Sequence, residues 1–188
     1  MINKLSKAII LLFVMVLVSC DSDDNDTVVI TGNVDGTWSI ESINYSGSST
    51  TTIDGLSTTA TFTGQSSNEN AIFVFTPDGD FTSNGSYDIT LNTTVAGQSQ
   101  TQEVSIDDYT SEGTWSQSGN ILTLVGELVS ISSGTPTIGD GDELSEDYTI
   151  LELTETTMVL NIVTNETVDS FGASIDVSLD GTLTFSKM

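Results

Sequence analysis

The sequence contains no histidine and no arginine, and its 188 residues include one cysteine and three lysines. These absences exclude histidine-based triads, imidazole metal ligands and arginine clamps on phosphate groups. A lone cysteine cannot form an internal disulfide, and no glycine-rich phosphate loop is present. Carboxylate chemistry, such as the paired acids of a glycosidase, is the catalysis that this composition still allows. Most carboxylates lie in turns and on polar strand faces, where they serve solubility, so we expect no enzymatic activity, metal or cofactor.

Acidic residues outnumber basic residues by 27 to 3, and the formal net charge is −24. If Lys4 and Lys7 are removed with a signal peptide, the charge becomes −26 and Lys187 is the only basic side chain left. A surface this anionic repels nucleic acid and anionic lipid headgroups, so we exclude nucleic acid as a partner. We also expect the folded protein to gain stability as salt screens its self-repulsion.

The first 19 residues have the pattern of a secretory signal peptide. Lys4 and Lys7 precede an apolar run over residues 8–18, which is shorter than the roughly 20 residues that a membrane-spanning helix needs. The run ends in Leu-Val-Ser-Cys, residues 17–20, which resembles the lipobox of bacterial lipoproteins. In that family the cysteine thiol carries diacylglycerol, and the signal is cut immediately before it. The resemblance makes Cys20 the lipid-attachment site, although an ordinary signal peptide with a chance cysteine is the alternative.

An acidic stretch without apolar residues, residues 21–26, follows the cysteine and predicts a solvated tether. Within it, Ser22-Asp23-Asp24 resembles the export signal of surface lipoproteins of the Bacteroidetes, which implies a surface-exposed place on the outer membrane. The aspartate spacing does not fit a calcium loop, because Asp26 and Gly32 stand where a glycine and a bidentate glutamate are needed.

The rest of the chain predicts an all-β fold. Thr, Val, Ile, Phe and Tyr dominate short alternating runs separated by Gly, Asn, Asp and Ser, and no convincing amphipathic helix is present. The clearest hairpin enters through residues 71–76, turns at Pro77-Asp78-Gly79 and leaves through residues 80–82. In the last run, residues 174–187, Gly181 stands where a side chain would point inward, as in a sharply bent barrel strand.

We expect about eight to ten antiparallel strands in up-and-down order, with a Ser/Thr-rich loop before Leu56 and a long acidic loop towards Asp147. Such a sheet must close or fold over to bury its apolar face, so the sequence predicts a β-barrel, with a β-sandwich as the alternative. The expected organisation is a signal peptide over residues 1–19, a lipidated cysteine and tether over residues 20–33, and one β domain over residues 34–188.

Several short motifs resemble those of lipocalins and lipocalin-like domains. Gly36-Thr37-Trp38 resembles the Gly-x-Trp signature at the start of the lipocalin barrel. The hairpin over residues 73–79, the strand opening Gly113-Thr114-Trp115 and the hairpin at Leu153-Thr154 resemble the lipocalin-like lipoproteins of the Bacteroidetes. Typical lipocalins also have an arginine on the last strand that packs on the first-strand tryptophan, and a helix beside the barrel. This chain has no arginine and no clear helix.

The resemblance implies a membrane-anchored, non-enzymatic barrel that binds a small apolar ligand or another envelope component. The alternative is a structural or interaction module that contacts a protein or glycan and holds no internal ligand. Core packing at the closed end is the first role expected of the two tryptophans. The side chains that would line an internal ligand site are Trp38, Phe75, Phe81, Trp115 and Tyr148. An open apolar lumen would favour the ligand carrier, and a filled interior would favour the interaction module.

Overall fold

The computed structural model describes residues 28–129, 145–170 and 173–188. These ranges contain strands and turns but no helix, and therefore no helix that could cross a membrane. The predicted lipid site Cys20, the acidic tether and most of the expected acidic loop lie outside the described residues. The strands are β1 (Val29–Ile30), β2 (Gly36–Ile53), β3 (Leu56–Phe75), β4 (Asp80–Val95), β5 (Gln98–Ser118), β6 (Ile121–Val125), β7 (Ser145–Leu153), β8 (Thr157–Ser170) and β9 (Ala173–Lys187).

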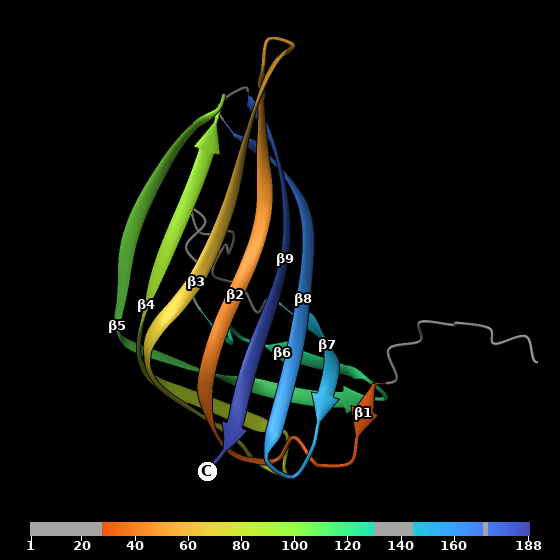
Figure 1. Ribbon diagram of the computed structural model, residues 1–188. Coiled ribbons are helices and arrows are strands. Elements are labelled where there is room, and N and C mark those ends of the chain that lie inside the picture. Colours follow the sequence, from red (N-terminus) through yellow and green to blue (C-terminus); the bar gives the residue numbers. More distant parts are fainter. Residues whose placement is uncertain (1–27, 130–144, 171–172) are drawn as a thin grey trace, which may run out of the picture.

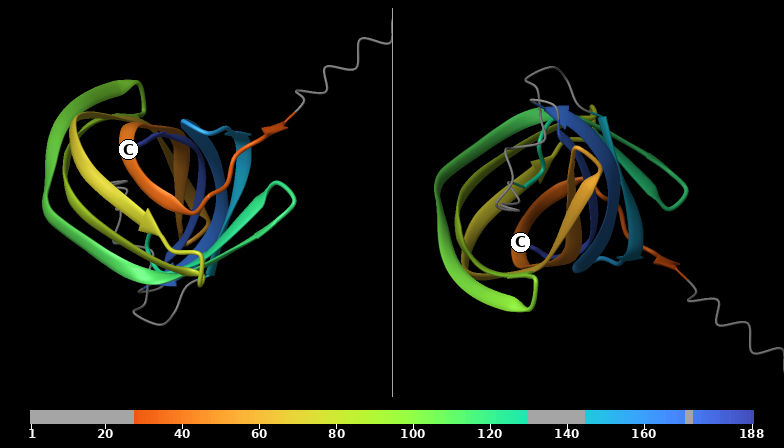
Figure 2. Two further views of the ribbon diagram at one scale, coloured as in Figure 1. Left: turned by 90° about the horizontal axis from the view of Figure 1, so that it is seen from below. Right: turned by 90° about the horizontal axis from the view of Figure 1, so that it is seen from above.

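Strands β2 to β9 form a closed antiparallel ring in sequence order. Each pairs with the next, and β9 returns to pair with β2 along most of its length. Pairing of β7 with β8 joins the two ends of the sheet and closes the barrel, which is visible end-on in Figure 2. The short strand β1 lies outside the ring, parallel to β7. The predicted up-and-down barrel is therefore confirmed, and the alternative of a sandwich is excluded.

The wall of the barrel differs between its two ends. At the lower end in Figure 1, which includes the turns at residues 76–79 and 154–156, all eight strands take part. Farther up, β6 covers only residues 114–118 of β5, and β7 pairs with β8 only as far as Asn161. Above that level β2 to β5, β8 and β9 continue as a curved wall of the described chain (Figure 1).

The prediction of a Ser/Thr-rich loop before Leu56 is wrong, because this stretch is the second half of β2. It pairs with β3 up to the contact between Ile53 and Leu56. The turn at Asp54 and Gly55 has positive φ angles of 50° and 79°, which a two-residue hairpin turn requires because its twist must match that of the two strands. Threonine is β-branched and favours strands, and the hydroxyls of Thr50 and Thr59 bond across the two strands at 2.9 Å.

The predicted hairpin around Pro77 is confirmed, and so is the buried face formed on its two sides. Phe75 and Phe81 are partners in the ladder, and both are 1% exposed. Residues 80–82, predicted as the outgoing side of the hairpin, are the start of a longer strand, β4, which continues past a bulge between Gly85 and Tyr87. Bulges of this kind let a long strand bend without ending.

A single hydrophobic core fills the interior of the barrel, and it includes Phe62, Leu91 and Leu179 of the upper half. Its largest fully buried members are Trp38, Tyr87, Tyr148, Phe73, Phe75, Phe81 and Phe185. Phe73 and Phe185 meet edge to face, with ring centroids 5.2 Å apart. The chain leaving β6 adds Leu128 and Val129 to the same core cluster, at 0% and 6% exposed. Burial of these large apolar side chains is the main stabilising contribution to the fold.

Lys187 on the last strand occupies the place that arginine has in typical lipocalins. Its Nζ lies 5.0 Å from the centre of the Trp38 ring, and the indole Nε1 of Trp38 donates a hydrogen bond of 2.7 Å to the carbonyl of Val34. Gly36 leaves room for the lysine, since a Cβ there would lie 2.6 Å from Lys187 Cε. The only basic side chain of the described chain is thus used as a cation over an aromatic ring.

Candidate functional site

The structure places the five aromatic side chains predicted to line a ligand site in the packed interior. Trp38, Phe75, Phe81 and Tyr148 are at most 1% exposed, and Trp115 is partly buried against the core. Phe75 stacks on Phe81 with centroids 5.9 Å apart and meets Trp115 edge to face at the same distance. The structure brings these three together by direct ring contact, whereas Trp38 lies against Lys187. Their contacts are with one another, so these residues act as core at the closed end.

Trp115 also ties the closed end together through hydrogen bonds. Its Nε1 donates to the carbonyl of Thr76 at 3.0 Å, and its backbone N–H donates to Gly79 at 2.7 Å. Both acceptors belong to the predicted turn around Pro77, so β5 is fixed to the end of the β3–β4 hairpin. The strand opening Gly113-Thr114-Trp115 therefore serves packing, as Gly36-Thr37-Trp38 does.

Polar groups enter the interior where β6 ends. Tyr148 donates a hydrogen bond of 2.6 Å to Glu146, and Tyr109 donates one of 2.7 Å to the carbonyl of Glu127. Burial raises the pKa of Tyr109 to about 12, and burial followed by the nearby Glu146 carboxylate raises the pKa of Tyr148 well above its usual range. Near Tyr109 the buried hydroxyl of Ser83 makes no hydrogen bond of good geometry. These tyrosines are neutral at physiological pH and fix the chain that follows β6.

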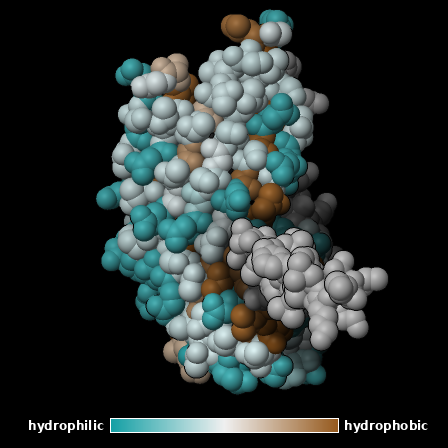
Figure 3. Space-filling model, turned by 45° about the vertical axis from the view of Figure 1, so that its right-hand side comes forward, coloured by the Kyte–Doolittle hydropathy of each residue, from teal (hydrophilic) through white to brown (hydrophobic). Residues whose placement is uncertain are grey.

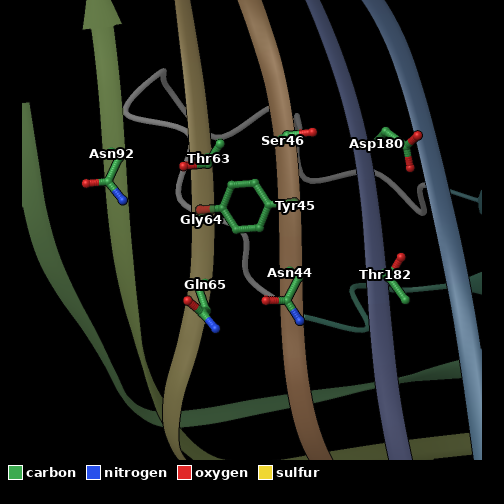
Figure 4. Close-up of a pocket in the computed structure, with 9 residues that line it drawn as sticks. All are labelled: Asn44, Tyr45, Ser46, Thr63, Gly64, Gln65, Asn92, Asp180 and Thr182. Atoms are coloured by element: carbon green, nitrogen blue, oxygen red, sulfur yellow. The ribbon is translucent and has the colours of Figure 1, made fainter. Parts of the chain in front are cut away.

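The outer face of the barrel carries a depression of about 510 Å³ over β4, β3, β2 and β9 (Figure 4). Its lining residues are Asn44, Tyr45, Ser46, Thr63, Gly64, Gln65, Asn92, Asp180 and Thr182. The polar members occupy outward-facing positions, where most of them are exposed. Figure 3 shows that the outer surface seen from the neighbouring side is largely hydrophilic to neutral, with smaller hydrophobic areas.

The depression lies where the ring of Tyr45 packs over Gly64 on the inner side of the sheet, with Gly181 beside Tyr45 on the next strand. Tyr45 is the ladder partner of Gly64 on β3 and of Gly181 on β9. A Cβ at Gly64 would collide with the Tyr45 ring, and one at Gly181 would lie 3.2 Å from Tyr45 Cβ and from Ile162. Because the glycines have no side chain, the backbone approaches the ring closely, which permits the outer surface to dip at this level.

Five side chains of the depression keep their full capacity for hydrogen bonding within the described part of the chain. Asn44, Ser46, Thr63, Gln65 and Thr182 make no side-chain hydrogen bond to another described residue. Elsewhere on the outer face such groups pair with each other, as the hydroxyls of Thr52 and Ser57 do at 2.8 Å and those of Thr94 and Ser99 at 2.8 Å. The depression therefore presents donors and acceptors that water occupies and that a polar ligand can replace.

The depression contains one charged group, the carboxylate of Asp180. This carboxylate accepts a hydrogen bond of 2.7 Å from Asn161, so it is held at the edge of the depression on β9. Among the residues that the structure describes, no group of three or more acidic, histidine or cysteine side chains has the geometry to hold a metal ion. The lining suits a hydrophilic ligand without negative charge, since one carboxylate within a strongly anionic protein repels anions.

Sequence reasoning did not find this depression. Asn44 and Ser46 fall in or beside the stretch expected to be a loop, and Gln65 and Asn92 follow the pattern of any solvated strand face. Gly181 was the one useful signal, because its inward position marked a close approach. What the sequence could not provide was the pairing that places Tyr45 between two glycines from distant segments.

Comparison with known proteins identifies the domain. A family model described as a lipocalin-like domain matches residues 34–160. No curated protein matches the chain. Among solved structures, it is similar to Ail, the attachment invasion locus protein of Yersinia pestis, crystallised with the heparin analogue sucrose octasulfate. That match has 11% identity, covers 80% of this chain and 99% of that chain, and has a TM-score of 0.25, from which no functional conclusion follows.

Proposed function

This chain belongs to the lipocalin-like domain family, and we propose that it is a lipid-anchored, non-enzymatic binding protein of the bacterial cell envelope. In this proposal residues 1–19 are the signal peptide, Cys20 carries the lipid, and the acidic tether leads into the barrel at residues 34–188. The protein faces outwards from the outer membrane, as in the lipocalin-like lipoproteins of the Bacteroidetes that its sequence motifs resemble.

We propose that the binding surface is the outer depression and that its ligand is a neutral glycan. The observation that carries this is the group of five polar side chains whose hydrogen-bonding capacity is unused, gathered over four strands. Amides and hydroxyls in this arrangement can exchange donors and acceptors with sugar hydroxyls. The closed end of the barrel is a weaker candidate, because its aromatic residues are occupied by contacts with one another.

Retention of the full-length lipidated protein, in detergent, on immobilised polysaccharides tests the proposal. We expect retention on neutral chains such as glucan or mannan, and none on the anionic chains heparin and polygalacturonate. The variants Asn44→Asp and Gln65→Glu keep the shape of each side chain and replace a donor with a charge. Each should weaken binding about tenfold, the effect of losing roughly one hydrogen bond and adding repulsion.

Asn84→Asp is the matched control, because Asn84 is an exposed amide on β4 that does not line the depression. This variant should bind as the wild type does. The glycan proposal is overturned if no neutral polysaccharide in the panel retains the protein, or if the depression variants and the control are retained equally.

The anchor is tested separately by Cys20→Ala. Loss of the thiol removes the site of acylation, so we expect unprocessed precursor or release of the protein from membranes, measured by fractionation and by mass spectrometry of the mature amino terminus. Normal cleavage together with unchanged membrane association would show that another element holds the protein on the membrane.

A small apolar ligand inside the barrel is the second candidate, favoured by the inner face of the upper half. Apolar side chains line this face above the level that β6 reaches, among them Phe62, Leu91, Val177 and Leu179. Native mass spectrometry of protein purified from its own membrane would reveal a co-purified lipid as a discrete mass increase. A single unliganded mass, with the expected acyl chains only, would exclude this candidate.

A further inference from the structure

The depression is the centre of a longer strip of outward-facing polar side chains that crosses the strands, and this whole strip is called the trough. Two neighbouring ladder rows of outward-facing polar side chains form it. The first row, in register from β5 to β9, is Thr101, Asn92, Thr63, Ser46 and Asp180. The second row, in register from β3 to β8, is Gln65, Asn44, Thr182 and Asn161.

The spacing of these rows defines an elongated site. Together they extend over six adjacent strands, and a strand spacing of roughly 4.8 Å gives a length of about 24 Å. Within a strand the two rows are two residues apart, or about 7 Å. The backbone around Tyr45 and Gly64 contributes to the lining between the rows. A site of this shape has polar groups along two sides and is several times longer than wide.

Side chains at both ends of the trough are held in place. Thr101 donates a hydrogen bond of 2.6 Å to Asn92 Oδ1, and Asn161 donates bonds of 2.7 Å to Asp180 Oδ1 and 2.8 Å to the carbonyl of Gly181. Beyond Asp180 the first row reaches Val163, an apolar residue that is 59% exposed, so the polar row ends there. The end positions are therefore preorganised, while the central side chains remain free to bond a ligand.

We infer that the trough binds a linear, unbranched, neutral polysaccharide as an extended chain laid across the strands. This inference rests on the proposed glycan-binding function and adds the form of the ligand. A single sugar or a compact branched glycan would use only the central side chains. An extended chain would reach both ends at once, and each added unit would contact another strand until the trough is filled.

The test is calorimetric titration of the full-length protein in detergent with neutral linear gluco- and manno-oligosaccharides, from the monosaccharide to the hexasaccharide. Affinity should rise with length and then level off. The end variants Thr101→Ala and Asn161→Ala should weaken binding of the hexasaccharide about fivefold to tenfold and leave binding of the disaccharide unchanged. The central variant Asn44→Asp should weaken binding at every length, and Asn84→Ala is the matched control.

The outcomes separate the two proposals. Affinity that is the same at every length, or end variants that weaken short and long chains equally, would overturn the inference of an extended ligand while leaving a glycan site. Absence of binding at any length would overturn the glycan proposal itself. Thermal unfolding midpoints of all variants identify any that fail to fold, and Asn161→Ser provides a second, smaller change at that end.

Discussion

At the scale of single residues, the barrel depends on side chains that meet across strands distant in sequence. Lys187 covers Trp38, and Tyr45 lies between glycines of two other strands. Each contact combines an aromatic ring with a position where a larger residue would not fit. The same principle explains why the Gly-x-Trp motif needs its glycine: Gly36 has a φ of +134° and Lys187 lies over it. Such positions tolerate little change although none is catalytic.

Gly64→Ala should destabilise the protein and alter the outer depression together. The new Cβ would collide with the ring of Tyr45, which would have to move within a packed interior. Overpacking of this kind costs about 1–3 kcal/mol in the free energy of unfolding. Urea denaturation measures this change. Equal stability of Gly64→Ala and wild type would contradict the close packing of Tyr45 against β3.

Buried tyrosines should make the protein sensitive to alkali. Burial raises the pKa values of Tyr45 and Tyr109 from 10.0 to about 12, so the folded protein holds these protons more tightly than the unfolded chain does. Their contribution to stability is complete below pH 10 and is lost as the pH rises through 12. The free energy of unfolding should fall over this window by about 1.4 kcal/mol per pH unit for each tyrosine.

Tyr109→Phe isolates the contribution of one buried tyrosine. It removes the hydrogen bond to Glu127 and so lowers stability at neutral pH by about 1 kcal/mol, but it should make the decline above pH 10 less steep. Guanidinium denaturation between pH 8 and pH 11.5 provides both values. An unchanged slope in the variant would mean that Tyr109 is not the residue that resists ionisation.

At the scale of elements, β2 and β3 are far longer than β6 and extend the outer face of the barrel. These strands continue as a paired ribbon to the turn at Asp54 and Gly55, well beyond the level where β6 ends. The ribbon is held by backbone pairing and by hydroxyl pairs such as Thr50 with Thr59, rather than by a broad apolar core. Its tip exposes Ile53 and Leu56, at 54% and 77%.

Gly55→Ala should loosen this tip without disturbing the core. Gly55 has a φ of +79° and nothing within 4 Å of the missing Cβ, so the cost is backbone strain alone, about 1 kcal/mol. Hydrogen exchange should accelerate at residues 50–59 and stay unchanged around Trp38. Asp54→Asn, which retains a residue tolerant of positive φ, should have little effect. Unchanged exchange at the tip in Gly55→Ala would show that the turn does not adopt this conformation.

At the scale of the whole molecule, the charge is almost entirely of one sign. The chain has 27 acidic residues against three basic ones. In the described part of the chain, Lys187 is the only basic side chain that offsets the acidic ones. The acidic side chains repel one another. Strand β1 begins at Val29, nine residues after Cys20, so the proposed lipid on Cys20 would keep the start of β1 within about 32 Å of the membrane surface.

Salt should stabilise the protein. Raising sodium chloride from about 10 mM to about 150 mM shortens the screening length from roughly 30 Å to 8 Å, which weakens repulsion between surface carboxylates. The thermal midpoint should rise by several degrees, and millimolar calcium should raise it further through general screening. Differential scanning calorimetry of the full-length protein in a non-ionic detergent measures the change. A midpoint that is flat across this range would contradict the role given to self-repulsion.

Local patterns in the sequence were sufficient for the strand character, the hairpin at Pro77 and the buried positions of Trp38, Phe75 and Phe81. These features depend on alternation and turn residues within a few positions, and the chain encodes them directly. The sequence also determined the overall charge and excluded the chemistries that need histidine or arginine. The extent of β2, in contrast, was underestimated, because a run of serine and threonine suits both a loop and a paired strand.

Only the tertiary structure decided how the barrel closes and which polar side chains lie side by side on its outer face. Ring closure between β7 and β8, the placing of Lys187 over Trp38, and the row that joins Asn92, Ser46 and Asp180 all unite residues far apart in the chain. A polar side chain on a solvated strand has the same local pattern whether its neighbours pair with it or leave it free. Its role is set by the register of strands on either side, which no local segment of sequence contains.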